Sequence, residues 1–411
     1  MGRVVDVIIG GAGQVLSEDE VTAFVGDALS GAGLEGRSVC VIVPDATRSC
    51  PLPLLIRAVH QALHGKVSKL TILIALGTHA EMTPDELRKH LGAEYDGVLN
   101  HEWWKPETFV GLGSISADRV REISGGLLND EVPVRLNRAV VEHDVALVVG
   151  PVFPHEVVGF SGGNKYFFPG VAGQEVIDVS HWLGALITSA SIIGTLGVTP
   201  VRALINEAAA LIPAEKLALA VVAQSGTNAL HAIAFGNTIE AWQAAAEVSA
   251  QTHVTYLDHP VRRVVSVMPA KYADIWTAAK GFYKLEPVVA DGGEVILYAP
   301  HVTQIAAMHP EIEEIGYHCR DYFVGQWEKF RDIHWGVLAH STHLRGAGTW
   351  DPITGEHLRV KVTLATGIPE EVVRRANLNY LDPATVDLAE YNADPDTLVV
   401  PNAGEVLHRL K

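Results

Sequence analysis

Residues 39–79 read VCVIVPDATRSCPLPLLIRAVHQALHGKVSKLTILIALGTH, and this stretch indicates the fold class. Two continuous apolar runs, Val39–Val43 and Leu70–Ala75, stand on either side of a segment that predicts a helix. Such short apolar runs are typical of strands that are buried on both faces of a parallel sheet. The stretch therefore predicts the strand–helix–strand alternation of an α/β protein.

The same alternation continues along the chain. Helix starts are predicted by capping boxes at Ser17 and Thr83 and by Thr199 before a proline. Further strands are predicted at Val145–Val149, Leu217–Val222, Val264–Val267, Val295–Leu297 and Leu398–Val400. We therefore expect an α/β protein with Rossmann-like sheets.

A domain boundary is predicted within residues 251–263, where a long Ala-rich segment ends and a new strand begins. The predicted domains are 1–255 and 256–411, both of ordinary size. A cleft between two such domains is a usual place for a ligand, so we expect an active site there.

The composition excludes several classes of protein. The chain has 411 residues, 48% hydrophobic and 19% charged, which excludes intrinsic disorder. With 31 basic and 48 acidic residues its net charge is −17, which argues against nucleic acid as a partner. Only three cysteines occur, so a disulfide framework or a Cys-rich zinc site is not expected.

Nothing in the sequence predicts a membrane partner. No apolar run is long enough to span a bilayer, which takes about 18 residues. The first 20 residues lack the apolar region and cleavage site of a signal peptide. We therefore expect a cytoplasmic protein.

The first candidate site is Asp45-Ala-Thr47-Arg48, directly after a predicted strand. Ligands of α/β proteins bind at the carboxyl ends of the strands. Thr47 and the start of the next helix could hold a phosphate, and Arg48 offers a planar fork for a carboxylate. The alternative is a helix cap at Asp45 and a surface arginine.

Two more motifs also follow apolar strands. His79, in Leu-Gly-Thr-His, is placed for acid–base work, although a loop histidine is the simpler alternative. Residues 154–170 read PHEVVGFSGGNKYFFPG, in which glycines permit close backbone approach and Lys165 could neutralise a phosphate or act as a nucleophile. The spacing is not that of a Walker loop. A surface turn with a solvated lysine is the alternative.

Together PDATR, GTH, PHxxxGFSGGxKxxxPG and the later His181 resemble the lactate racemase family, whose members are nickel-pincer nucleotide enzymes. The motifs stand in family order, and the match covers most of the predicted N-terminal domain. It continues more weakly in the C-terminal one. The resemblance implies that 1–255 binds the cofactor and that 256–411 closes the cleft.

The resemblance also implies a nickel-bearing pyridinium-3-thioamide-5-thiocarboxylic acid mononucleotide, tethered to Lys165 through the thioamide. One protein histidine, His181, would be the metal ligand, because the cofactor brings its own carbon and sulfur donors. Soft sulfur donors suit nickel. Five further residues would bind the cofactor: Asp45, Thr47, Ser161, Gly162 and Gly163.

The reaction implied is racemisation or epimerisation of a 2-hydroxy acid by proton-coupled hydride transfer. His79 and His155 would be the two acid–base groups, one for each enantiomer, and an imidazole pKa near 6.5 suits that work. Arg48 and Lys280 would bind or polarise the substrate. The partners implied are the substrate and the enzymes that synthesise the cofactor.

Several positions depart from the family pattern. Thr277 stands where the family has glutamine, and Trp327 follows a family-like glutamine and could pack on the substrate. Two histidines and an arginine, His340, His343 and Arg345, are predicted in a polar loop after a strand at Trp335–Ala339. They could read a second polar group, which favours a substrate larger or more polar than lactate. A plain polar loop is the alternative.

Two other functions compete with this interpretation. The histidines could bind zinc directly, which would give a hydrolase or a lyase, but no HExxH-like pair is present. The chain could also be a non-catalytic binder of an organic acid or a nucleotide. The joint presence of His79, His155, Lys165, His181 and Lys280 argues against a mere binder.

Overall fold

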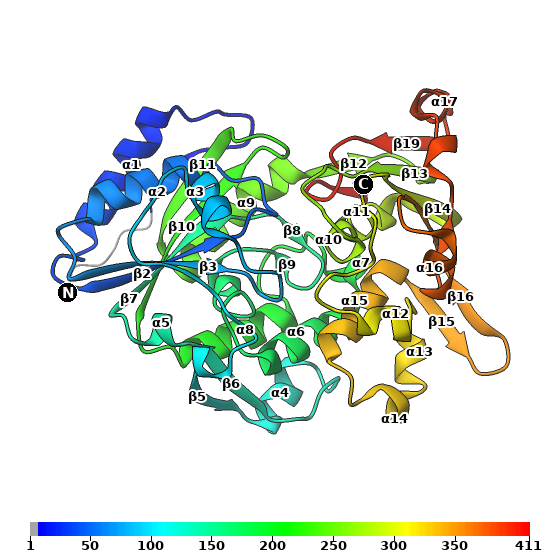
Figure 1. Ribbon diagram of the computed structural model, residues 1–411, viewed down its shortest axis with the longest axis horizontal. Coiled ribbons are helices and arrows are strands. Elements are labelled where there is room, and N and C mark those ends of the chain that lie inside the picture. Colours follow the sequence, from blue (N-terminus) through cyan, green and yellow to red (C-terminus); the bar gives the residue numbers. More distant parts are fainter. Residues whose placement is uncertain (1–6) are drawn as a thin grey trace. The chain divides into compact units, whose positions relative to one another are not determined.

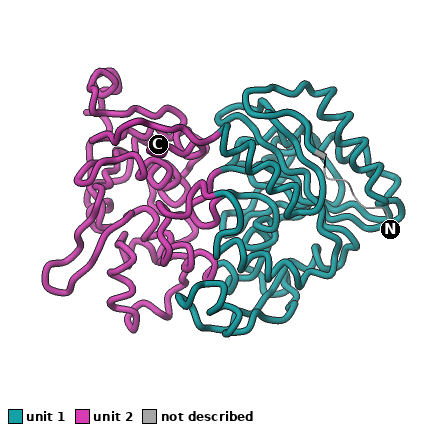
Figure 2. The backbone as a smooth tube through the Cα atoms, turned by 180° about the vertical axis from the view of Figure 1, so that it is seen from behind, with its two compact units in different colours: residues 1–153, 160–177, 196–252 teal, residues 154–159, 178–195, 253–411 magenta. Residues whose placement is uncertain are grey.

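The computed structural model describes residues 7–411, which form two compact units (Figure 2). Unit 1 contains the chain up to residue 153, with 160–177 and 196–252. Unit 2 contains 154–159, 178–195 and 253–411. The last change of unit lies close to the predicted boundary at 255/256, but the two early segments of unit 2 have no signal in the sequence. Residues 1–6, part of the stretch used for the N-terminal prediction, lie outside the described residues.

Unit 1 is built on a seven-stranded sheet of order β1-β11-β10-β7-β2-β3-β4 (Figure 1). The five strands from β10 to β4 are parallel, and β11 and β1 continue the sheet antiparallel. The predicted strands of this unit are confirmed. The bounds are β1 Val7–Gly10, β2 Ser38–Pro44, β3 Lys69–Ala75, β4 Val98–Asn100, β7 Val145–Pro151, β10 Glu215–Ala223 and β11 Leu230–Asn237.

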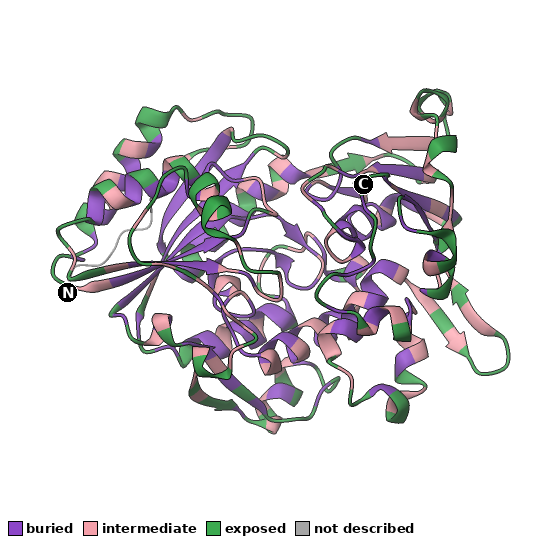
Figure 3. Cartoon of the chain, viewed as in Figure 1, coloured by how far each residue is buried: buried purple, intermediate pink, exposed green. Residues whose placement is uncertain are grey.

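Both faces are buried in the central strands of this sheet, as the apolar runs predict, whereas the edge strands β1 and β4 are partly exposed (Figure 3). Val41 and Leu147 pack in one cluster with side chains of α1 and α2, while Ile42 and Val148 are buried on the opposite face. Each fully buried Val, Leu or Ile contributes about 1.5–3 kcal/mol to folding. Little room is left for polar groups along these strands, so they collect at the strand ends.

The helices of unit 1 begin where the sequence predicts. Ser17 and Thr83 form complete capping boxes, and Thr199 caps a helix that starts at Pro200. The bounds are α1 Glu18–Gly31, α2 Leu52–Leu63, α3 Pro84–Leu91, α4 Ala117–Ile123, α5 Arg138–Val141, α8 Pro200–Ala210 and α9 Thr238–His253, with a hairpin of β5 Phe109–Ile115 and β6 Val132–Asn137.

Unit 2 contains a second sheet, of order β18-β17-β14-β13-β19, in which all strands are parallel. The fold is thus α/β, as expected, with one mainly parallel sheet in unit 1 and one wholly parallel sheet in unit 2. The predicted cleft between the domains stays a prediction. The strands are β13 Val261–Val267, β14 Val289–Ala299, β17 Lys361–Thr366, β18 Asn379–Tyr380 and β19 Thr397–Val400, with the pairs β12 Val254–Leu257 and β20 Leu407–Leu410, and β15 Gly348–Asp351 and β16 Gly355–Leu358.

Short helices surround this sheet. They are α7 Ser189–Ile192, α10 Ile275–Ala278, α11 Lys280–Tyr283, α12 Glu311–Ile315, α13 Arg320–Val324, α14 Trp327–Phe330, α15 Trp335–Arg345, α16 Glu370–Arg375 and α17 Leu388–Ala393. The longer α6, Gln174–Ile187, starts in unit 1 and enters unit 2 at residue 178. No helix among residues 7–411 is both long and apolar enough to cross a membrane.

The prediction of a strand at Trp335–Ala339 and a polar loop at His340–Arg345 is wrong, because both segments belong to helix α15. Val337, Leu338 and Leu344 are buried at helical spacing. A short apolar run does not distinguish a strand from a buried helix, and here tertiary contacts decide.

The contact that fixes the start of α15 comes from Asp178 on α6. Its Oδ1 accepts the backbone N–H of Gly336 at 2.8 Å, and its Oδ2 lies 3.2 Å from Nδ1 of His334. A carboxylate at a helix N-terminus satisfies an otherwise unpaired amide. Asp178 thereby ties α15 to the helix that carries His181.

We expect Asp178→Ala to lower the free energy of unfolding of unit 2 by about 1 kcal/mol, which is the usual effect of losing a helix cap. Hydrogen exchange should then be about fivefold faster at the first amides of α15. The matched control is Asp332→Ala, which removes an exposed carboxylate close by in the sequence. Equal exchange rates in the two variants would show that Asp178 does not hold α15.

Candidate active site

In unit 1, the ends of the adjacent strands β2 and β3 bring Asp45 and His79 together. Oδ2 of Asp45 lies 2.5 Å from Nδ1 of His79, and Oδ1 accepts the amide and hydroxyl of Thr47 at 3.1 and 2.6 Å. The carboxylate accepts hydrogen bonds, so Nδ1 of His79 carries the proton and Nε2 presents its lone pair. His79 is thus held in the tautomer of a base.

The structure distinguishes the two interpretations of the segment from Asp45 to Arg48, a ligand site and a helix cap. Helix α2 begins at Leu52 after Pro51, without any side-chain cap, so Asp45 is not a helix cap. Thr47 lies in a turn ahead of the helix start, so the predicted phosphate site would use this turn and not the first turn of α2.

The charge state of Asp45 follows from its surroundings. Burial acts to raise the pKa of this carboxyl, but the charge of the His79 ring when it is protonated, the hydrogen bond of His79 and the hydrogen bonds of Thr47 outweigh burial and hold the pKa well below its usual range. Asp45 therefore stays ionised near neutral pH, although only 8% of the residue is exposed.

The loop that carries Lys165 is fixed by contacts with two buried side chains, Arg202 and Trp242. Arg202, 1% exposed, donates to the carbonyls of Phe160 and Gly162 and stacks on Trp242 with its guanidinium carbon 4.1 Å from the ring centroid. Nε1 of Trp242 donates to the carbonyl of Ser161 at 2.9 Å. The sequence gives no sign of this buried arginine, because it lies on a helix some 40 residues away.

The two glycines of this loop are required by packing. Gly162 has φ +90°, and a Cβ there would lie 2.7 Å from Val152. At Gly163 a Cβ would lie 2.8 Å from the carbonyl of Thr238 and from Trp242. Ser161 Oγ accepts the amide of Phe153 at 3.0 Å. The cofactor-binding role of Ser161, Gly162 and Gly163 stays a prediction beside these structural roles.

The Lys165 loop and the His79 turn are joined within unit 1. The amide of Gly77 donates to the carbonyl of Gly170 at 3.0 Å, at the end of the motif that contains Lys165. Tyr166, which sequence reasoning missed, is packed against Gly150. Burial raises the pKa of its phenol well above 10, so Tyr166 is a neutral neighbour of this region.

Unit 2 holds the other predicted catalytic groups, His155 and Lys280. His155 is buried, and its Nδ1 accepts the amide of Val157 at 3.1 Å and lies 3.3 Å from Oε2 of Glu156. Lys280 is 7% exposed, donates to the carbonyl of Thr277 at 3.4 Å and lies 5.6 Å from the ring centroid of Tyr272.

The predicted metal ligand His181 is half-buried on α6. Its Nδ1 lies 3.4 Å from Oγ of Ser180. The next residue, Trp182, stacks on Trp327 with ring centroids 5.5 Å apart. Trp327 starts helix α14, and the ring on which it stacks belongs to the residue that follows His181.

The four remaining substrate candidates all have protein contacts. Thr277 donates its hydroxyl to Oδ1 of Asp274 at 2.7 Å. His340 stacks on Trp276 at 3.9 Å, and Arg345 donates to the carbonyl of Asn377. His343 is buried, and burial lowers its pKa to about 4, so it is neutral near pH 7.

These positions do not form a metal site made by protein alone. Among residues 7–411, no group of three or more His, Cys, Asp or Glu side chains is arranged to hold a metal ion. The cysteines Cys40, Cys50 and Cys319 are buried. A protein-ligated zinc site would need about three such side chains together.

Comparison with known proteins identifies relatives of this chain. The family model for the lactate racemase N-terminal domain matches residues 26–194. The lactate racemase of Thermoanaerobacterium thermosaccharolyticum is 30% identical over 152 residues, and that of Lactiplantibacillus plantarum 27% over 148. Each match covers 35% of this chain and 32% of the relative, so the chain spans about a third of the length of the curated relatives it matches.

Two solved structures match almost the whole chain. One, of a Thermotoga maritima protein, has a TM-score of 0.90 at 34% identity and covers 97% of this chain and 100% of that one. The lactate racemase apoprotein of T. thermosaccharolyticum has a TM-score of 0.73 at 20% identity and covers 98% and 100%. The second likeness shows a shared fold.

We expect Asp45→Asn to destabilise unit 1 by about 2 kcal/mol at pH 7, through the loss of hydrogen bonds to a charged group. The folded pKa of Asp45 is depressed, so its stabilisation is complete above the unfolded value of about 3.9 and is lost as the pH falls further. Urea unfolding of the wild type and of Asp45→Asn should give a smaller difference in the free energy of unfolding at pH 3 than at pH 7. Asp85→Asn, at a carboxylate 89% exposed, is the control. A pH-independent difference would contradict this account.

Proposed function

The chain belongs to the lactate racemase family, and on this basis we propose that it racemises or epimerises a 2-hydroxy acid with a lysine-tethered nickel-pincer nucleotide. The observation that carries the proposal is the His79–Asp45 pair at the ends of β3 and β2. It leaves Nε2 of His79 able to take the proton of a substrate hydroxyl.

The side chains of this protein fit a metal that receives most of its donors from a cofactor. Residues 7–411 contain no group of three or more His, Cys, Asp or Glu side chains that could hold a metal ion. His181 would add one nitrogen ligand, and Lys165 would carry the thioamide link. Sulfur donors suit nickel and are not supplied by the buried cysteines. When bound, this group would accept a hydride from the substrate carbon and return it.

The nucleotide part of the cofactor would lie against residues of unit 1 that come after strands β2 and β7 in the chain. We propose Asp45, Thr47 and the Ser161–Gly163 loop for this contact. The stiffness of the loop, which Arg202 and Trp242 hold by hydrogen bonds, would fix the position of Lys165 before any cofactor binds. The enzymes that synthesise the cofactor would be required partners.

The remaining groups would act on the substrate. His79 and His155 would exchange the hydroxyl proton, one taking it from the substrate and the other returning one to the product oxygen, so that no net proton is consumed. Arg48 and Lys280 would bind the carboxylate. Asp45 would keep His79 in the base tautomer.

The substrate is proposed to be larger or more polar than lactate. Thr277 has a short side chain already bonded to Asp274, and Trp327, His340, His343 and Arg345 lie on α14 and α15. Trp327 stacks on Trp182, and Arg345 donates to the carbonyl of Asn377. For Trp327 and Arg345 these contacts favour the role of positioning neighbouring residues.

The test is the intact mass of the protein made together with the cofactor-synthesis enzymes. The wild-type chain should carry an adduct that Lys165→Ala abolishes. Lys329→Ala, at an exposed lysine, should keep it. His181→Ala should keep the adduct and lower the nickel content about tenfold or more, because one ligand is lost.

Activity is measured in parallel by chiral chromatography over a panel of 2-hydroxy acids. Interconversion by the wild type and none by Lys165→Ala is the expected result. A wild-type chain without an adduct on Lys165, or full activity in either variant, would make the assignment wrong.

A further inference from the structure

Glu156 is a carboxylate of unit 2 to which the sequence motifs give no role. Its side chain is 13% exposed, and its Oε2 lies 3.3 Å from Nδ1 of His155. Val157, the next residue, packs on α6, because a Cβ on Gly184 would meet its Cα at 3.2 Å. The backbone on both sides of Glu156 is therefore fixed, and its carboxylate is held in the interior.

The groups that face Glu156 are basic and come from two helices of unit 2. Lys280 and Lys284 stand four residues apart at α11, and His343 comes from α15. The two helices are packed together, with the rings of Tyr283 and His343 6.3 Å apart. Burial acts to raise the pKa of Glu156, but the charge of His343 when its ring is protonated and the charges of the two lysines outweigh it and hold the pKa below its usual value. The carboxylate is therefore ionised.

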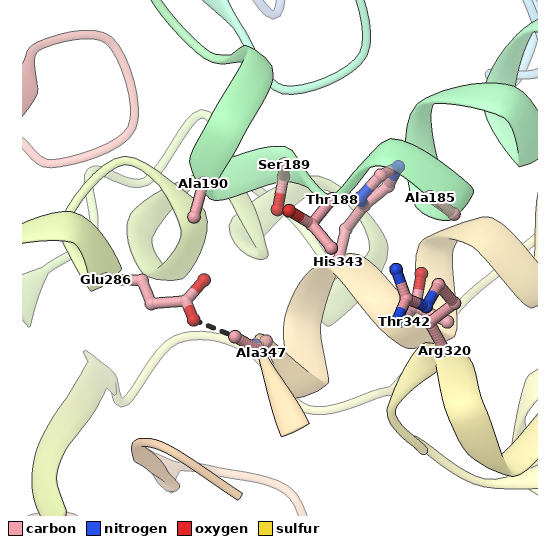
Figure 4. Close-up of a pocket in the computed structure, with 10 residues that line it drawn as sticks. Ala185, Thr188, Ser189, Ala190, Glu286, Arg320, Thr342, His343 and Ala347 are labelled. Carbon is pink, nitrogen blue, oxygen red and sulfur yellow. Dashed lines mark hydrogen bonds between the residues drawn. The ribbon is translucent and has the colours of Figure 1, made fainter. Parts of the chain in front are cut away.

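His343 contributes little positive charge at neutral pH, because it is kept neutral by burial. Its Nε2 has no hydrogen-bond partner among residues 7–411, and neither has Oε2 of Glu286. Both residues line a small pocket, partly open to solvent, whose interior has room for about one water molecule (Figure 4). Because His343 is neutral near pH 7, the permanent positive charges that face Glu156 are those of Lys280 and Lys284.

The contacts of His155 show what Glu156 does for it. In the neutral ring, Nδ1 accepts the amide of Val157, so the proton sits on Nε2. When the ring gains a second proton on Nδ1, Oε2 of Glu156 is the carboxylate oxygen that lies 3.3 Å from this nitrogen. A carboxylate at this distance stabilises the charged imidazolium. Nε2 of His155 therefore carries a proton in both the neutral ring and the imidazolium. In the neutral ring of His79, by contrast, Nε2 carries none.

We propose that Glu156 is a positioning residue that holds His155 in the proton-donating form and balances the charge of Lys280. The proposal rests on the proposed function for its catalytic meaning. Each acid–base histidine then has its own carboxylate, Asp45 for His79 and Glu156 for His155, but the two resting tautomers differ. As a neutral ring, His79 presents the lone pair of Nε2 and can take a proton, whereas His155 gives a proton as the imidazolium that the Glu156 carboxylate stabilises.

The first test needs no cofactor. The ring resonances of His155 are followed by NMR in the apoprotein across the pH range, with His155→Gln for assignment. In Glu156→Gln the titration midpoint should fall by about one pH unit, because the imidazolium loses its carboxylate. Glu156→Asp should lie between the two. Glu405→Gln, which removes another buried carboxylate of unit 2 paired with Lys271, is the control and should not move it.

An unchanged midpoint in Glu156→Gln would overturn the proposal. So would an equal change in Glu405→Gln, because it would show a general effect of removing buried charge. A wild-type neutral ring with its proton on Nδ1, read from the nitrogen shifts, would contradict the assigned tautomer.

The second test uses the loaded enzyme. Glu156→Gln should lower kcat about tenfold and leave KM equal or lower, because Lys280 becomes more available to an anionic substrate. A purely structural role would instead raise KM and lower the thermal midpoint, and this result would overturn the proposal. If the wild type converts no 2-hydroxy acid, the proposed function fails, and the apoprotein titration still decides the role of Glu156.

Discussion

Parallel strands that are buried on both faces leave only their ends for chemistry, and unit 1 is organised by this constraint. In β2, β3 and β7, side chains such as Val41 and Ile42 fill opposite faces with apolar contacts. A polar side chain in the middle of these strands would lose its hydration without a partner. Asp45 and His79 therefore follow the strands, where backbone turns supply hydrogen bonds and adjacent parallel strands bring them together.

The second organising feature is that buried charged groups have close partners. Asp45 accepts from His79 and Thr47, and Arg202 donates to two carbonyls of the Lys165 loop. Glu156 faces basic groups of two helices in unit 2. An unpaired charge in these places would cost several kcal/mol. The same contacts that make burial tolerable also fix tautomers and loop positions, so stability and the proposed chemistry depend on the same side chains.

Sequence patterns predicted the strands and helix starts well, because burial on two faces and helix capping are local properties. They failed at Trp335–Arg345, where an apolar run followed by polar residues is helical. The capping contact there comes from Asp178, more than 150 residues away, which no local pattern contains. They left two interpretations of Asp45 open, a ligand site and a helix cap, and only the structure shows that Asp45 faces a histidine that follows the next strand.

The sequence by itself determined the fold class, the family and the identity of most candidate groups, because each depends on residue types at fixed spacing. Tertiary structure alone decided which of these groups touch, which tautomer each histidine adopts and which charges surround Glu156. The physical reason is that hydrogen bonds and electrostatic interactions act over a few ångströms in space. Partners such as Asp45 and His79, or Glu156 and His343, are distant in the chain and become neighbours only when strands and helices pack.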